Sequence, residues 1–163
     1  MRTVKRGATI LLAEDNPNDA VLFILACEKA CPSIQVSVVC NGFQAVQYLK
    51  GTGRYADRTA YAFPEMAVLD LCMPIMNGFQ VLQWIREQPC LKDLFVVVLA
   101  GALSDSDSRL ACQMGADAYV VKPCGLHPLV ETIARLRDAW VCRCKSSEAG
   151  MGDPVKPTLR EVA

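Results

Sequence analysis

The chain is 163 residues long, and its 17 basic and 17 acidic side chains cancel to a formal net charge of zero at pH 7. A chain without a basic field is not a typical binder of nucleic acid or of an anionic membrane surface, so both are excluded as main functions. Its hydrophobic fraction of 52% is ample for the core of one domain. The basic residues 1–7 lead into an apolar stretch that suits neither a signal peptide nor a membrane span, which predicts a cytoplasmic location.

Apolar runs alternate with helix-like segments from the beginning of the chain. Residues 9–13 form a continuous apolar run typical of a buried strand. Asn16 then offers a capping side chain, and Pro17 occupies the first helical position. The elements expected from here to the middle of the chain are a helix to about residue 30, a β-branched strand at 34–40, a short helix at 41–49 and a loop at 51–64.

The second half repeats this alternation. The expected elements are strand 66–70, helix 77–88, strand 94–99, helix 104–114, strand 118–121 and an amphipathic helix to about residue 141. The strand at 94–99 is apolar without alternation, which predicts burial on both faces. Beyond residue 141 the apolar periodicity is lost, so a flexible tail is expected.

Five such strand-helix units with right-handed crossovers predict an α/β fold. The simplest arrangement is a doubly wound, five-stranded parallel sheet in the order 2-1-3-4-5, a flavodoxin-like three-layer sandwich. The expected organisation is an N-terminal extension at 1–7, one domain at 8–141 and a tail at 142–163.

The nine cysteines are scattered through the predicted strands and helices. Their odd number and irregular spacing predict buried thiols in a reducing compartment rather than a disulfide framework. The closest pairs are Cys27 with Cys31 and Cys142 with Cys144, and the only histidine, His127, is near neither in sequence. A four-ligand zinc site is therefore poorly supported.

Charged side chains follow three of the predicted strands. Glu14 and Asp15 come after the first strand, Asp70 closes the third, and Lys122 follows the fifth. Because open α/β sheets place their sites at the carboxyl edge, we expect these groups to converge there. Three carboxylates and one ammonium can form a divalent-cation site beside a nucleophilic carboxylate. Each residue alone also has an ordinary interpretation, as a helix-capping turn or a solvated lysine.

Three sequence blocks resemble the receiver domain of two-component response regulators. They are Leu-Leu-Ala-Glu-Asp-Asn-Pro, Val-Leu-Asp-Leu-Cys-Met-Pro-Ile-Met-Asn-Gly and Gly-Ala-Asp-Ala-Tyr-Val-Val-Lys-Pro, in the right order. The similarity runs over about residues 8–140. The loop at 51–64 further resembles the stand-alone receivers that work with phytochrome-like histidine kinases. The resemblance implies a single-domain response regulator that acts in phosphorelay signal transduction through protein-protein contact.

The resemblance also implies a role for each residue at the expected sheet edge. Asp70 would take a phosphoryl group from the phosphohistidine of a histidine kinase or phosphotransfer protein. Asp15 and Asp70 would bind Mg²⁺ directly, Glu14 through water, and Cys72 through its backbone carbonyl. Lys122 would contact Asp70 before the reaction and a phosphoryl oxygen after it.

By the same resemblance the chain is not an enzyme with a separate substrate, but a phosphoacceptor that catalyses its own phosphorylation and slow autodephosphorylation. Cys72 and Ala102 would flank the path of the hydrolytic water, and neither side chain carries an amide or carboxylate to orient it. A cis peptide before Pro123 would aim Lys122 inward.

One position departs from the family's pattern. Ala100 stands at the end of the fourth strand, where receivers carry Thr or Ser. In the family this hydroxyl binds a phosphoryl oxygen and makes room for the switch aromatic, here Tyr119, to rotate inward. Backbone amides near Gly101, or the Ser104 hydroxyl after a loop movement, are the candidates to replace it. The alternative function is therefore a receiver-like docking module whose phosphorylation-driven switching is weakened or absent.

Other functions of this fold are disfavoured. No glycine-rich loop follows the first strand, which argues against nucleotide and flavin binding, and an aspartyl phosphatase would want a second acid where Cys72 stands. The resemblance implies kinase docking on the first helix near Val21 and Ile24. It also implies a homodimer face formed by the fourth and fifth strands and helices. Core burial is the ordinary explanation of both apolar stripes.

Overall fold

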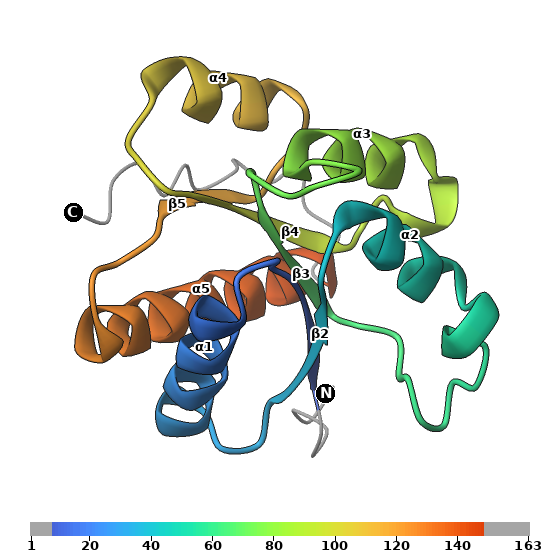
Figure 1. Cartoon of the computed structure of the whole chain (residues 1–163), viewed down its shortest axis with the longest axis horizontal. Helices are drawn as coiled ribbons and strands as arrows, with labels where there is room; N and C mark the ends of the chain where they lie inside the picture. The colour runs from blue at the N-terminus through green and yellow to red at the C-terminus, as the bar shows by residue number, and fades with distance from the viewer. Residues whose placement is uncertain (1–7, 149–163) are drawn as a thin grey trace.

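Strands and helices alternate along residues 8–148, which the computed structural model of the chain describes (Figure 1). In chain order they are β1 (Thr9–Ala13), α1 (Pro17–Ala30), β2 (Gln35–Val39), α2 (Gly42–Lys50), η1 (Gly53–Tyr55), β3 (Met66–Asp70), α3 (Gly78–Glu87), η2 (Pro89–Leu91), β4 (Phe95–Ala100), α4 (Asp105–Gln113), β5 (Ala118–Val121) and α5 (Leu126–Glu148). The η elements are single 3₁₀ turns. Every expected strand is confirmed within one residue at each end.

The strands form one parallel sheet in the order β2-β1-β3-β4-β5, which confirms the predicted topology. Helices α1 and α5 cover one face, and α2, α3 and α4 cover the other (Figure 1). Strands β1, β3 and β4 are buried along their whole length. Their continuous apolar runs are therefore those of strands packed between two helical layers.

The registry of the sheet aligns the carboxyl ends of its central strands. Ala13 of β1 is paired with Leu69 of β3, and Asp70 is paired with Leu99 of β4. Ala100 is in turn paired with Val121 of β5. The residues that follow β1, end β3 and follow β5 consequently lie along one edge of the sheet, as the sequence predicts.

Side-chain caps fix where the helices begin next to this edge. The Asn16 side chain accepts a hydrogen bond from the Asn18 N–H (2.9 Å) ahead of α1. Asn77 and Gln80 form a reciprocal capping box at the start of α3. These caps satisfy backbone groups that the first turn of a helix leaves unpaired. They also keep the loops after β1 and β3 short, so that α1 and α3 begin close to the strand ends that carry the acidic residues.

Helix α5 is longer than its apolar pattern predicts. It continues through residues 142–148, where the sequence predicts a flexible tail. Arg143 holds this extension by an ion pair with Asp117 and by donating a hydrogen bond to the Asp93 carbonyl (2.7 Å). A polar anchor leaves no apolar periodicity in the sequence, which is why the helix end was misplaced. The expected extension at 1–7 and the tail residues 149–163 lie outside the described part of the chain.

The prediction that the cysteines are buried is largely wrong. Cys27 is buried in α1, and burial raises the pKa of its thiol to about 12. Cys31 is half-buried. The remaining cysteines are exposed, namely Cys40, Cys72, Cys90, Cys112, Cys124, Cys142 and Cys144. Among residues 8–148, no helix is both long enough and apolar enough to span a membrane.

Candidate phosphoacceptor site

Side chains from the ends of β1, β3 and β5 meet at the carboxyl edge of the sheet. The Lys122 Nζ donates hydrogen bonds to Glu14 Oε2 (2.7 Å), to Asp70 Oδ2 (2.7 Å) and to Asp19 Oδ2 (3.1 Å). Glu14 and Asp70 are buried, with 3% and 4% of their surface exposed, whereas Asp15 is exposed. The four charged residues that the sequence assigned to this edge thus lie together in the structure.

Asp70 is held from both sides of its carboxylate. One oxygen, Oδ2, accepts the hydrogen bond from Lys122, and the other, Oδ1, accepts one from the Cys72 backbone N–H (3.0 Å). The loop after β3 returns so closely that a Cβ on Gly78 would lie 2.5 Å from the Asp70 carbonyl oxygen. Only glycine fits at this approach, so the tight loop is part of what fixes Asp70 in place.

Burial and charge act in opposite directions on this group of residues. Burial raises the pKa of Glu14, and the hydrogen bonds from Lys122 and from the Asn16 N–H oppose that rise only in part. Burial alone would lower the pKa of Lys122, but its hydrogen bonds to Asp70, Glu14 and Asp19 outweigh burial and raise the pKa instead. Lys122 therefore remains a cation at neutral pH and compensates the buried carboxylates.

The acidic residues also have the chemistry of a divalent-cation site. Carboxylate oxygens of Glu14, Asp15 and Asp70 all lie within 4.8 Å of one another. Hard cations such as Mg²⁺ prefer oxygen ligands and retain several waters, which the exposed side of Asp15 leaves room for. The donor set therefore fits Mg²⁺. The contact that the structure gives between Cys72 and Asp70 is made by the Cys72 N–H. The Cys72 carbonyl as a metal ligand therefore stays a prediction.

Asp19 is a member of the site that the sequence analysis missed as a functional residue. It lies in the first turn of α1, where an acidic side chain has an ordinary explanation as a favourable charge at a helix N-terminus. It lies two residues after Pro17, the first residue of α1, and this helix begins directly after the sheet edge that carries Glu14 and Asp15. That position was the available signal.

The expected cis peptide before Pro123 is wrong, because every peptide bond in residues 8–148 is trans. Lys122 reaches Asp70 by another route. Its backbone N–H donates to the Ala100 carbonyl (2.7 Å) and so continues the pairing of β5 with β4 by one residue. Strand geometry alone thus directs Lys122 to the edge.

The residues of the expected switch have defined contacts. Ala100 is buried at the end of β4, with 3% of its surface exposed. The Tyr119 ring is half-buried against the core under α4, and its hydroxyl donates to the Ala102 carbonyl at a long 3.4 Å. The Ser104 hydroxyl caps α4 by accepting from the Asp107 N–H (3.2 Å). Moving Ser104 toward Asp70 would remove this cap, so it is a poor replacement for the missing hydroxyl.

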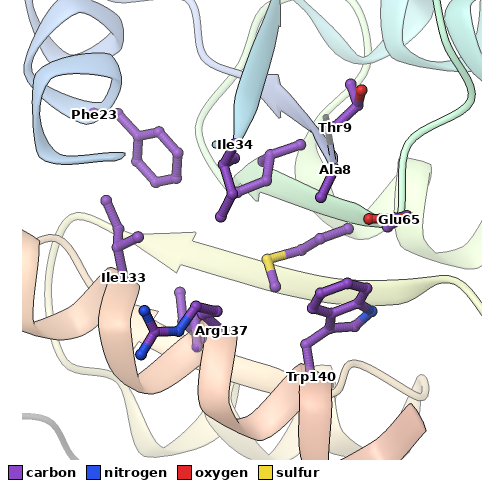
Figure 2. A pocket seen from close by; sticks show the side chains of 11 residues that line it. Ala8, Thr9, Phe23, Ile34, Glu65, Ile133, Arg137 and Trp140 are labelled. Atoms are coloured by element: carbon purple, nitrogen blue, oxygen red, sulfur yellow. The ribbon is translucent and has the colours of Figure 1, made fainter. Parts of the chain in front are cut away.

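A small cavity lies at the opposite, amino-terminal edge of the sheet, between β1, β3, α1 and α5 (Figure 2). Phe23, Ile133 and Trp140 form much of its wall, and its volume is about 20 Å³. A space of this size holds roughly one water molecule. It is therefore not a site for an organic substrate or cofactor.

The fold and the acidic edge define a known class of signalling protein. The chain belongs to the response regulator receiver domain family, whose family model matches residues 10–134. Receiver domains act in two-component signalling, where they interact with histidine kinases or phosphotransfer proteins. The resemblance that the sequence blocks indicated is thereby confirmed.

Several relatives match over most of their length. The probable methanogenesis regulatory protein FilR2 of Methanothrix harundinacea is 32% identical over 135 residues, which are 81% of this chain and 83% of FilR2. The structure of the phosphorylated cyanobacterial phytochrome response regulator RcpA is 29% identical, with a TM-score of 0.74 over 83% of this chain and 94% of RcpA. The Mn²⁺-bound response regulator Rcp1, a protein of Synechocystis, is 26% identical, with a TM-score of 0.71 over 82% and 94%.

Proposed function

We propose that the chain is a single-domain response regulator that accepts a phosphoryl group on Asp70 in a Mg²⁺-dependent reaction. One observation carries the proposal: the buried Asp70 carboxylate accepts a hydrogen bond from the Lys122 ammonium and lies within 4.8 Å of carboxylate oxygens of Glu14 and Asp15. A structural role alone gives no reason to bring these carboxylates together, because buried like charges cost free energy. Such an arrangement is expected where charge must be handled during a reaction.

The proposed reaction moves one phosphoryl group between two proteins. An oxygen of Asp70 forms a bond to phosphorus while the phosphorus-nitrogen bond of a phosphohistidine breaks, and the electron pair remains on the imidazole. The Cys72 N–H holds the carboxylate in position, and Lys122 offers its ammonium to an oxygen of the incoming group. These contacts exist before the donor arrives, so little reorganisation is needed.

Magnesium is the cofactor that this donor set favours. Glu14, Asp15 and Asp70 would hold it, with the Cys72 carbonyl as the remaining ligand from the protein. When bound, the cation offsets the negative charge that accumulates between the carboxylates and the phosphoryl group. The Mn²⁺-bound form of Rcp1 supports a divalent cation in a related protein.

The proposed partners follow from the relatives. RcpA is a phytochrome response regulator, so a histidine kinase of the phytochrome type is the partner class that we propose for this chain. Output would pass through protein contact in the cytoplasm. A homodimer through the β4-α4-β5-α5 face is part of the proposal, and the exposed Leu110 of α4 and Leu103 of the loop before α4 supply apolar surface for it.

The docking module is the weaker of the two functions considered. Ala100 is its main support, because the hydroxyl that couples phosphorylation to the fifth strand is absent. A module that only docks has no use for a buried Asp70 paired with Lys122. A relay role accommodates both facts, because passing on a phosphoryl group demands less conformational change than activating an attached output does.

The first test is the intact mass of the protein after incubation with acetyl phosphate, with and without Mg²⁺. We expect a gain of one phosphoryl group that requires Mg²⁺ and is absent in Asp70→Asn. Asp105→Asn is the matched control, because it removes an exposed carboxylate from the first turn of α4, outside the acidic site. The gain should persist for many minutes after the donor is removed, since the exposed Cys72 and Ala102 offer no group to orient water.

A folded protein that gains no mass and does not bind beryllofluoride would contradict the phosphoacceptor function. Loss of the phosphoryl group within seconds would contradict only the slow autodephosphorylation.

A further inference from the structure

Lys122 has three N–H donors, and each one is used by a different carboxylate. Two of the acceptors, Glu14 and Asp70, belong to the group of oxygens that can hold a cation, together with Asp15. The third acceptor, Asp19, is outside that group. It is also the most exposed of the three, with 43% of its side chain accessible against 2% for Glu14 and 6% for Asp70.

A divalent cation and Lys122 are like charges that compete for the same oxygens. A cation held by Glu14 and Asp70 weakens the attraction of both for the ammonium, and it also repels the ammonium directly. Lys122 then needs an acceptor that the cation does not use. Asp19 is already in contact with it at 3.1 Å and offers that acceptor without any movement of the backbone.

The position of Asp19 is fixed by the start of α1. The Asn16 side chain caps α1, Pro17 occupies the first helical position, and Asp19 lies two residues after Pro17. A carboxylate on a capped helix is held more firmly than one on a loop. Asp19 can therefore retain Lys122 near Asp70 while the other two acceptors are engaged elsewhere.

We infer that Asp19 is a positioning residue for Lys122: it holds the ammonium at the site when Glu14 and Asp70 bind a divalent cation, so that Lys122 no longer competes for their oxygens and binding of the cation is strengthened. This inference rests on the proposed function, because it concerns the same acidic site. It assigns to Asp19 a role distinct from that of the cation ligands and from that of an acidic residue that only stabilises a helix N-terminus.

The test is a Mg²⁺ titration without phosphodonor, followed by the backbone amide NMR signals of Glu14, Asp15 and Cys72. In Asp19→Asn we expect the dissociation constant for Mg²⁺ to rise about threefold to fivefold, the size expected from one partly exposed charge pair. Asp19→Glu should recover most of this affinity. Asp105→Asn removes the same charge from the first turn of α4 and should leave the constant unchanged.

The second readout is the side-chain ¹⁵N signal of Lys122, which is visible only while the ammonium is held and protected. With saturating Mg²⁺ it should persist in the wild type and in Asp19→Glu but broaden in Asp19→Asn. A role in helix stability alone would lower the melting temperature without moving this signal.

Wild-type affinity and a persistent Lys122 signal in Asp19→Asn would overturn the inference. The proposed function would be untouched if the wild type still gained mass from acetyl phosphate. A wild type that neither bound Mg²⁺ nor gained mass would overturn both.

Discussion

At the carboxyl edge of the sheet, the Lys122 ammonium donates hydrogen bonds to three carboxylates, and these contacts compensate the buried negative charge. Glu14 and Asp70 are buried, so without Lys122 they would carry uncompensated negative charge in a poorly solvated place. Lys122 therefore has two tasks in the proposed function. It stabilises the resting site, and it is the group that would meet a phosphoryl oxygen.

Replacing Lys122 by methionine should therefore destabilise the protein in a pH-dependent way. Without the opposing hydrogen bond from Lys122, burial raises the folded pKa of Glu14 further above its ordinary 4.5. Because the folded pKa lies above the unfolded value of 4.5, the penalty is small below pH 4.5, grows as the pH rises from 4.5 to the folded pKa, and is constant above it. We expect a loss of about 3 kcal/mol in the free energy of unfolding at pH 7.5 and clearly less at pH 5.

Urea unfolding at the two pH values measures this difference. Lys92→Met is the control, because Lys92 is exposed in the loop before β4. An equal penalty for Lys122→Met at both pH values would show that lost packing, rather than buried charge, is the cause.

A second prediction concerns the space around Gly78, beside the Asp70 backbone. A Cβ at this position would lie 2.5 Å from the Asp70 carbonyl oxygen and 3.1 Å from the Leu71 Cα, both of which are backbone atoms that cannot turn aside. We expect Gly78→Ala to cost about 1–3 kcal/mol of unfolding free energy through overpacking and to slow phosphorylation by displacing Asp70. At Gly101, a Cβ meets nothing within 4 Å, so Gly101→Ala should change neither quantity. Equal effects of the two substitutions in urea unfolding would contradict the steric argument.

The sequence was informative about residues whose place follows from a strand end, and less so about those placed by contacts. Asp70 and Lys122 could be assigned because a strand's carboxyl end has a fixed position in a parallel sheet. Asp19 could not be separated from an ordinary helix-start residue, since only its contact with Lys122 distinguishes it. The cis peptide before Pro123 was expected from the family resemblance and is wrong, because the peptide is trans and strand pairing at Ala100 directs the lysine.

At the scale of elements, apolar periodicity locates a helix only where the helix is held by apolar packing. This accounts for the expected first part of α5, in which Leu129, Ile133 and Leu136 pack on the sheet. Residues 142–148 are held differently, through Arg143 and Asp117. The prediction that the cysteines are buried failed for a related reason. Cysteine is treated as an apolar residue in a sequence pattern, but its small thiol is also tolerated on a protein surface.

Arg143→Ala should consequently loosen the end of α5. The substitution removes the ion pair with Asp117 and the hydrogen bond to the Asp93 carbonyl, while Arg86 and the Val96 N–H still bind Asp117. We expect amide hydrogen exchange in residues 142–148 to rise at least about tenfold, which corresponds to a loss of about 1.4 kcal/mol. Arg135→Ala, an exposed position earlier in the same helix, should leave that exchange unchanged. Unaltered protection in Arg143→Ala would mean that other contacts hold the extension.

At the scale of the whole molecule, the strand order does most to create the site. The order β2-β1-β3-β4-β5 puts β3 between β1 and β4, so Asp70 at the end of β3 lies between the acidic pair that follows β1 and Ala100 at the end of β4. Alternating elements and right-handed crossovers make this order the simplest arrangement. They cannot say how strongly one part of the molecule responds to another, because that depends on individual hydrogen bonds across the edge.

Ala100 makes this response testable. A charge-assisted hydrogen bond contributes about 1.5–3 kcal/mol, whereas driving a two-state change nearly to completion requires about 5.5 kcal/mol. Without a hydroxyl at position 100, we expect beryllofluoride with Mg²⁺ to shift amide NMR signals near Asp70 but to leave those of Tyr119 and α4 largely in place. In Ala100→Thr the shifts should extend to Tyr119 and α4.

Ala100→Val is the control, because valine has nearly the same shape as threonine but lacks the hydroxyl, and this variant should behave like the wild type. If valine propagated the change as well as threonine does, the cause would be side-chain volume at the buried end of β4. If the wild type already showed the full change, the edge of the sheet would be coupled to Tyr119 through the backbone contact at Ala102.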